Sequence, residues 1–137
     1  MEKNATLTKM DQTAIKALHD LISQEEIRIL KKPTPGLLMM TVKDSFETDF
    51  YLGEILVTEA IVEFQECKGY GLVMGDEPER AYLAASLETI FQSDQQELIR
   101  SLTDFLALQA GKQAEKEEQE KNLIARTAVR FESMVKG

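Results

Sequence analysis

The sequence predicts an α+β fold, a single domain in which an antiparallel β-sheet is covered by α-helices, with helices at both termini. Three observations support this prediction. Apolar residues recur at helical spacing near both ends of the chain. The central region, 26–75, is rich in β-branched and aromatic residues and is punctuated by glycine and proline. A length of 137 residues suits one domain, 1–137, with one core.

The first expected element is an amphipathic helix from Thr6 to about Ser23, within an N-terminal helical region 1–24. Either Thr8 or Asp11 can cap its start with a side-chain oxygen. Its apolar residues fall three and four positions apart, as one face of a helix requires: Leu7, Met10, Ala14, Leu18 and Leu21.

The first part of the strand region is expected to contain a turn and a buried strand. Residues 31–36 hold two prolines and a glycine, which preclude a regular ladder of hydrogen bonds and predict a turn. The apolar run 37–42 has turn signals on both sides, and we expect a strand buried on both faces.

The second part carries the strongest strand signal, residues 50–64. Fifteen residues are long for one strand, and Gly53 stands where a bulge or bend would divide it. Gly69 is expected to supply the next turn, and 70–74 a further short strand.

The helical region 78–137 begins at Pro78, because proline suits the first turn of a helix. The alanine-rich helix that follows is small-sided enough to lie close to a sheet. A further helix starts near Asp94, and Gly111 would end or bend it. Residues 113–121 have no apolar face, so they are either exposed or flexible. A final helix has its apolar side at Ile124, Ala128, Phe131 and Val135.

The overall charge excludes two classes of partner. A net charge of −8 and a pI near 4.7 are wrong for a nucleic-acid binder and for a protein of anionic membrane surfaces. No run approaches the ~20 apolar residues of a membrane helix. The single Cys67 cannot form an internal disulfide, so a reducing cytoplasm is the expected compartment.

Charge is also distributed unevenly along the chain. Residues 44–66 contain seven acids and no Lys or Arg, whereas 121–137 contain four basic residues and only one acid, Glu132. Such an asymmetry indicates either contacts between surfaces, within or between chains, or simply two solvated faces.

The inventory of catalytic residues is small. One His and one Cys, His19 and Cys67, cannot assemble a common zinc site within one chain. The glycines of 69–75 are better explained by a turn and a strand exit than by phosphate binding. Glu54 is a charge inside an apolar strand. Either Gly53 bulges the strand and turns the Glu54 side chain to solvent or to an arginine, or Glu54 is catalytic.

Three segments resemble the PhnG family, small subunits of the bacterial carbon–phosphorus lyase core complex. The first two are Phe50–Glu54 with 58–62, and 69–75 leading into Glu79 and Arg80. The third, 125–137, is similar to the family's terminal Ala-x-x-x-Val-x-Phe-x-x-Met-Val-x-Gly. The chain departs from the family at Ala85, where relatives carry an aspartate.

The resemblance implies a required but non-catalytic subunit of that complex. It would support formation of α-D-ribose 1-methylphosphonate 5-triphosphate from ATP and methylphosphonate, with adenine displaced, together with PhnI-, PhnH-, PhnJ- and PhnL-like subunits. No cofactor or metal is expected on this subunit, since ATP and the phosphonate are substrates of the whole complex. The alternatives are a small carboxylate enzyme built on Glu54 and a free-standing homodimeric binding module.

The residues expected to form an interface or a structural motif come from the resembling segments and the basic tail. The isolated protein is also expected to self-associate as a dimer, because apolar contact surface would otherwise stay uncovered. The candidates are Phe50, Gly53, Glu54, Tyr70, Gly75, Arg80, Arg126, Arg130 and Phe131.

Overall fold

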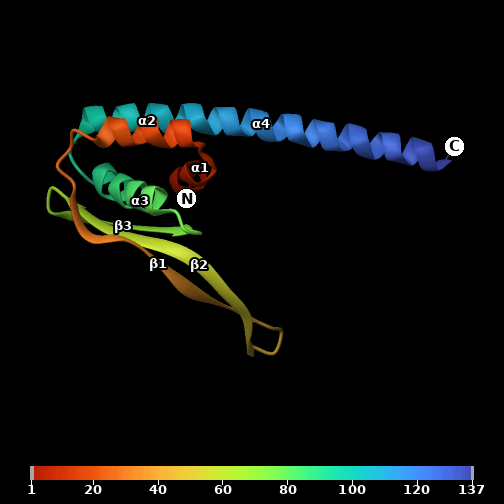
Figure 1. The fold of residues 1–137 in the computed structure, drawn as a ribbon, viewed down its shortest axis with the longest axis horizontal. Helices are drawn as coiled ribbons and strands as arrows, with labels where there is room; N and C mark the ends of the chain where they lie inside the picture. The colour runs from red at the N-terminus through yellow and green to blue at the C-terminus, as the bar shows by residue number, and fades with distance from the viewer. Residues whose placement is uncertain (1, 137) are drawn as a thin grey trace.

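The computed structural model describes the backbone of residues 2–136 and the side chains of residues 5–125. Three strands form one antiparallel sheet of order β1-β2-β3, and helices cover one of its faces (Figure 1). The predicted α+β fold with terminal helices is therefore confirmed. The elements in chain order are α1 (Glu2–Lys9), α2 (Gln12–Ile22), β1 (Arg28–Lys43), β2 (Asp49–Phe64), β3 (Cys67–Met74), α3 (Pro78–Phe91) and α4 (Gln96–Lys136).

The N-terminal segment forms two helices where one was predicted. Asp11 has an extended backbone, with φ −78° and ψ 174°, and this interrupts the helix between α1 and α2. Its Oδ1 accepts a hydrogen bond of 2.8 Å from the Ala14 N–H. Asp11 therefore caps a helix as expected, but it caps the second helix, and α1 turns away from α2 (Figure 1).

Helix α3 lies directly on the sheet, and α2 and α4 form the next layer above it (Figure 1). The close approach of α3 depends on two glycines of β3. A Cβ on Gly69 would stand 2.0 Å from the Ala85 carbonyl oxygen, and one on Gly71 would stand 2.2 Å from that of Ala81. The predicted proximity of the alanine-rich helix to a sheet is confirmed.

The hydrophobic core fills the space between the sheet and the helical layers. It combines the apolar faces of α1 and α2, most of α3, the last part of β2 and the first turns of α4. Its largest completely covered apolar side chains are Leu7, Ile15, Leu18, Ile22, Val62, Leu83, Leu87, Ile90 and Leu102.

The turn expected at residues 31–36 is absent, because β1 runs continuously from Arg28 to Lys43. Its pairing with β2 shifts register twice in this segment, between Ile29 and Lys31 and between Lys31 and Thr34. Prolines are tolerated in an edge strand at such irregularities, since no second neighbouring strand requires their missing N–H. The prolines and the glycine of 31–36 therefore mark irregular pairing between β1 and β2, and not a turn.

The second hairpin turn lies earlier than predicted. Gln65 and Glu66 form it, with φ of 51° and 65°, whereas Gly69 lies inside β3. Helix α3 starts at Pro78 as predicted.

Helix α4 runs unbroken through Gly111, which neither ends nor bends it as expected. At 1.5 Å per residue its 41 residues span about 60 Å, and its last half extends past the rest of the molecule (Figure 1). Residues 113–121 are helical and mainly exposed, so the first of the two interpretations applies. Among the described residues, no helix has the length and apolarity needed to span a bilayer.

Candidate interaction surface

Strands β1 and β2 extend beyond the helices as a two-stranded ribbon (Figure 1). We use "ribbon" for residues 36–56, which comprise the last half of β1, the connecting loop and the first half of β2. The "body" is the remainder of the sheet with α1, α2, α3 and the first half of α4. Among the described residues, no helix covers either face of the ribbon (Figure 1).

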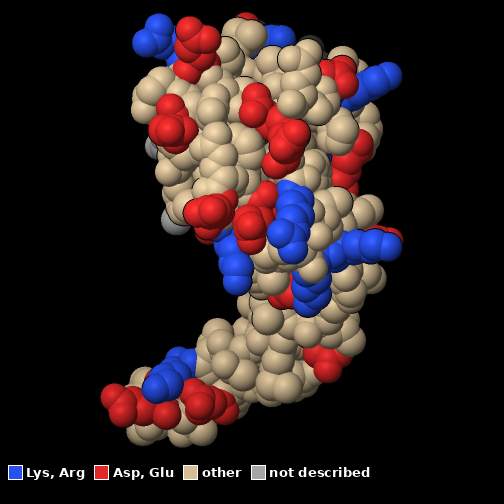
Figure 2. Space-filling model, turned by 90° about the vertical axis from the view of Figure 1, so that its left-hand side faces the viewer, with Lys and Arg blue, Asp and Glu red and all other residues tan. Residues whose placement is uncertain are grey.

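The ribbon exposes a run of large apolar side chains. Leu37 is 67% exposed and Met39 is 64% exposed, and Figure 2 shows the ribbon as a largely uncharged arm with charged side chains gathered at its tip. The expectation that 37–42 is buried on both faces is wrong, since no helix reaches it. The exposed apolar residues of the ribbon are Leu37, Leu38, Met39, Met40, Val42, Phe46, Phe50, Tyr51, Leu52 and Leu56.

Strand pairing places apolar residues on both faces of the ribbon. Residues opposite each other in an antiparallel pair share a face, and neighbours along a strand alternate. One face therefore carries the pairs Leu37–Leu56 and Met39–Glu54, and the other carries Leu38–Ile55 and Met40–Gly53. A two-stranded ribbon gains little stability on its own, and exposed apolar patches of this kind are typical of surfaces that bind another protein.

Three predicted residues lie in the ribbon. Gly53 has φ +144° and adjoins a register shift between Met40 and Thr41, so the predicted irregularity is present although β2 continues through it. Phe50 is half exposed near the tip. Glu54 is exposed to solvent opposite Met39, as the solvent-facing interpretation expects.

The loop at the tip of the ribbon is ordered by Asp44. Its Oδ1 accepts hydrogen bonds of 2.9 Å from both the Phe46 and the Thr48 N–H groups. Glu47 adopts φ +61°, and the Phe46 ring is 85% exposed. The side-chain bonds of Asp44 thus hold an acidic loop that presents an aromatic ring.

Tyr70 belongs to a polar cluster on the face of the sheet that no helix covers. Its hydroxyl donates a 2.6 Å hydrogen bond to Glu59, whose other carboxylate oxygen contacts the Lys31 ammonium. The Lys31 and Tyr70 bonds lower the pKa of Glu59, and the bond to the Glu59 carboxylate raises the pKa of Tyr70. The cluster ties all three strands together.

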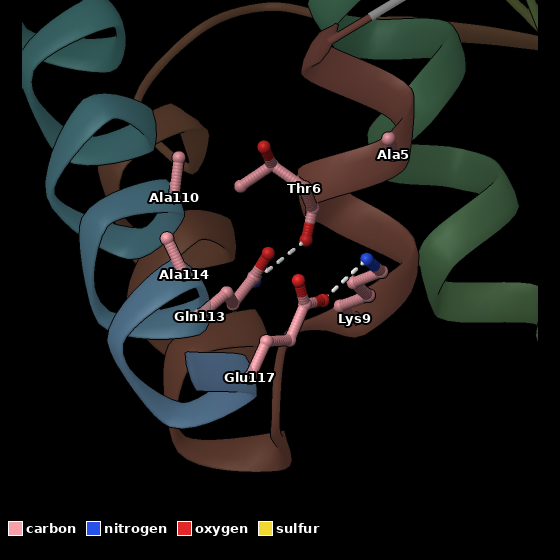
Figure 3. Close-up of a pocket in the computed structure, with 7 residues that line it drawn as sticks. All are labelled: Ala5, Thr6, Lys9, Ala110, Gln113, Ala114 and Glu117. Atoms are coloured by element: carbon pink, nitrogen blue, oxygen red, sulfur yellow. Dashed lines mark hydrogen bonds and ion pairs between the residues drawn. The ribbon is translucent and has the colours of Figure 1, made fainter. Parts of the chain in front are cut away.

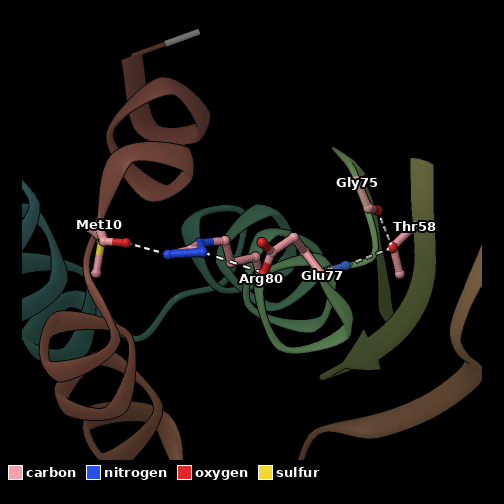
Figure 4. Close-up of polar contacts among 5 residues, drawn as sticks. All are labelled: Met10, Thr58, Gly75, Glu77 and Arg80. Carbon is pink, nitrogen blue, oxygen red and sulfur yellow. Dashed lines mark hydrogen bonds and ion pairs between the residues drawn. The ribbon is translucent and has the colours of Figure 1, made fainter. Parts of the chain in front are cut away.

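Gly75 and Arg80 lie at the joint between the sheet and α3 (Figure 4). The buried Thr58 hydroxyl donates to the Gly75 carbonyl at 2.6 Å and accepts from the Glu77 N–H at 2.9 Å. Arg80 donates to the Met10 carbonyl and lies 3.4 Å from a Glu77 oxygen, which fastens α3 to the end of α1. These two candidates therefore act in the structure of the body.

A hollow of about 580 Å³ opens between α1 and α4 (Figure 3). The Gln113 amide donates a 3.0 Å hydrogen bond to the Thr6 carbonyl across it, and Lys9 pairs with Glu117 at 2.6 Å. The Lys9 bond lowers the pKa of Glu117. The other residues of its walls are Ala5, Ala110 and Ala114, and the two polar contacts link α1 to α4 across the hollow.

The remaining predicted candidates are in the basic tail: Arg126, Arg130 and Phe131. They belong to the part of α4 whose side chains lie outside the described residues. Within the described part of the chain, no three His, Cys, Asp or Glu side chains come close enough to hold a metal ion.

Sequence reasoning missed the apolar residues of β1 as interface candidates. The signal that could have found them is the length of the run 50–64: fifteen residues in one strand span about 50 Å, more than three times the ~14 Å radius of gyration expected for the domain. Part of such a strand must extend beyond the core, and the apolar run 37–42 is paired with that part.

A model of one protein family covers essentially the whole chain. It is described as phosphonate metabolism protein PhnG, and it matches residues 2–137. No curated protein matches the chain.

Proposed function

The chain belongs to the PhnG family of phosphonate metabolism proteins, and from this membership we propose that it is a non-catalytic but required subunit of a cytoplasmic carbon–phosphorus lyase complex. In this proposal the complex displaces adenine from ATP with methylphosphonate. The product is α-D-ribose 1-methylphosphonate 5-triphosphate.

The observation that carries the proposal is the uncovered apolar ribbon. Exposed apolar patches beyond a few hundred Å² are characteristic of surfaces that bind another protein. Leu37 and Met39 on one face, and Leu38 and Met40 on the other, are between 40% and 67% exposed. A ribbon of this kind fits a groove between or within other subunits, where both faces are covered at once.

The small catalytic inventory of the sequence supports a division of labour. We assign adenine displacement to the PhnI-like subunit and cleavage of the carbon–phosphorus bond to the PhnJ-like subunit, with PhnH- and PhnL-like subunits as further partners. This chain would hold no cofactor of its own. Its contribution is to position other subunits through the ribbon.

Co-expression with the PhnI-, PhnH- and PhnL-like subunits tests the proposal. We expect the chain to co-purify with them, and omission of the chain to abolish adenine release from ATP in the presence of methylphosphonate. The double variant Leu37→Asp/Leu38→Asp should lose co-purification while its melting temperature stays unchanged. Leu123→Asp is the matched control, because Leu123 is equally exposed but lies on α4.

Two results would contradict the proposal. One is full activity of the complex without this chain. The other is turnover by the isolated chain that Glu54→Gln abolishes, which would establish the carboxylate enzyme instead. The double variant Arg126→Ala/Arg130→Ala tests the basic tail in the same pull-down: weakened assembly by about 2 kcal/mol indicates an interface role.

A further inference from the structure

The outer edge of β1 is unpaired along its whole length. Within the described part of the chain β1 pairs only with β2, so one row of its backbone N–H and C=O groups has no partner strand there. An unpaired edge is a template for another strand, and proteins usually protect it with lysine, proline or irregular pairing.

The first half of the β1 edge has this protection. Lys31, Lys32, Pro33 and Pro35 follow one another there, and the register shifts twice. The opposite edge of the sheet is short and partly covered, since the Tyr70 N–H of β3 is directed at the Glu88 carboxylate of α3 at 3.4 Å.

The second half of the β1 edge lacks this protection by lysine, proline or irregular pairing. Residues 36–42, Gly-Leu-Leu-Met-Met-Thr-Val, contain no charge and no proline, and every one of them is exposed. Their pairing to β2 is regular from Gly36 to Met40. This segment is therefore open to pairing along about 23 Å.

We propose that the occupant of this edge is a second copy of the same chain, paired antiparallel through residues 36–42 about a two-fold axis near Met39. The two three-stranded sheets then join into one six-stranded sheet. The inference does not depend on the function proposed above, and it leaves the faces of the ribbon available to other proteins.

Charge complementarity selects this arrangement. With Met39 opposite Met39, the acidic loop of one copy, which carries Asp44 and Glu47, extends alongside residues 31–34 of the other. The exposed Lys32 lies there and makes no ion pair among the described residues. The two-fold axis repeats the contact, so each end of the apolar segment is closed by opposite charges.

Other pairings of two copies are disfavoured by the same charges. A parallel pairing would bring the two acidic loops together, which repels. Face-to-face packing on the face of Leu37 and Met39 would cover the Glu54 carboxylate of each copy, since Glu54 lies opposite Met39, and covering an unpaired charge is costly. Antiparallel pairing at the edge keeps the two acidic loops apart, sets each near a lysine of the other copy and leaves Glu54 in solvent.

The mass of the full chain in solution is the first test. Sedimentation velocity at ~10 to ~100 μM should give twice 15.5 kDa. Met39→Lys places two ammonium groups at the axis and should raise the dimer Kd at least tenfold. Met74→Lys is the matched control, because Met74 is 68% exposed against 64% for Met39 but lies on β3; it should leave the Kd unchanged.

Cross-linking tests the register and does not rely on a disruptive variant. In a Cys67→Ser background, Met39→Cys should form an intermolecular disulfide under mild oxidation, since opposed residues of antiparallel strands have Cα atoms within disulfide range. Met74→Cys should stay reduced. A monomer at ~100 μM, a dimer that Met39→Lys leaves intact, or equal cross-linking at the two positions would each overturn the proposal.

Discussion

The two halves of strand β2 have the same kind of sequence and opposite environments. Residues 57–64 are covered by α3, and Ala60 and Val62 are completely buried. Residues 49–56 are equally rich in aromatic and branched side chains, yet Phe50, Tyr51 and Leu52 are more than half exposed. An apolar strand is therefore not evidence of its own burial.

The difference comes from the elements next to each half of β2. Beside the buried half, Gly69 and Gly71 of β3 have no side chains, and the α3 backbone lies where their Cβ atoms would be. Beside the exposed half, residues 2–136 supply no third strand and no helix (Figure 1). Small residues in neighbouring elements, and not the strand's own sequence, decide which half enters the core.

The largest expected effect separates the two regions by leucine truncation. Leu87→Ala in α3 should lower the free energy of unfolding by about 3 kcal/mol, because this side chain is 1% exposed and its removal leaves a cavity. Leu52→Ala in the ribbon, at a side chain that is 61% exposed, should change it by less than about 0.5 kcal/mol. Urea unfolding of both variants measures the difference, and equal losses would show that the ribbon is part of the core.

The next effect tests the close approach of α3. Gly71→Ala should cost about 2 kcal/mol, because its Cβ would meet backbone atoms of Ala81 and Ala85 within 3 Å, and backbone cannot rotate away. Gly36→Ala is the matched control in the ribbon, where nothing lies within 4 Å, and should be neutral within about 0.5 kcal/mol. The same urea titration applies, and a neutral Gly71→Ala would contradict the packing.

Local signals in the sequence predicted much of the fold. The start of α3 at Pro78 and the small face of α3 each depend on a few neighbouring residues, and both were predicted. Asp11 was one of two predicted caps, and it caps α2 rather than the start of one long helix. The prediction of a turn at 31–36 was wrong, because prolines break a hydrogen-bond ladder only where a second neighbouring strand needs their N–H. Whether β1 has a second neighbour is a tertiary fact that no local pattern records.

The interaction surface was predicted less well, for a related reason. Phe50, Gly53 and Glu54 were named through the family resemblance and do lie on the ribbon. The residues opposite them on β1 were assigned to the core, since an apolar run with turns at both ends has the same pattern whether helices cover it or not. Gly75 and Arg80 proved to connect elements of the body.

A smaller effect concerns the point where β2 passes from ribbon to body. Thr58→Val should cost about 1.5 kcal/mol, because it leaves the Gly75 carbonyl and the Glu77 N–H without their partner at a buried site. Thr41→Val in the ribbon makes the same chemical change at an exposed residue and should be nearly neutral. Thermal melts of the pair check this, and a neutral Thr58→Val would mean that the joint carries no stability.

The smallest expected effect is a pH dependence in the body. The Lys31 ammonium and the Tyr70 hydroxyl hold the pKa of Glu59 below the ordinary value of a glutamate. A carboxylate with a lowered folded-state pKa stabilises the fold above its unfolded-state pKa, and this stabilisation is lost as pH falls through the lowered value. The stabilisation by Glu59 should therefore be complete at pH 6 to 7 and should fade only below about pH 4.5.

The matched variants Glu59→Gln and Tyr70→Phe measure this contribution against the wild-type chain. The gap in melting temperature between wild type and Glu59→Gln should be constant from pH 6 to 7 and should narrow as the pH falls below about 4.5. In a Tyr70→Phe background, the difference in melting temperature caused by Glu59→Gln at neutral pH should be smaller than in the wild-type background. The reason is that Tyr70→Phe removes one of the two bonds that favour the charged carboxylate. If the difference in melting temperature between wild type and Glu59→Gln widened in acid, the pKa shift of Glu59 would have the opposite sign. The cluster on the open face of the body would then favour a protonated Glu59.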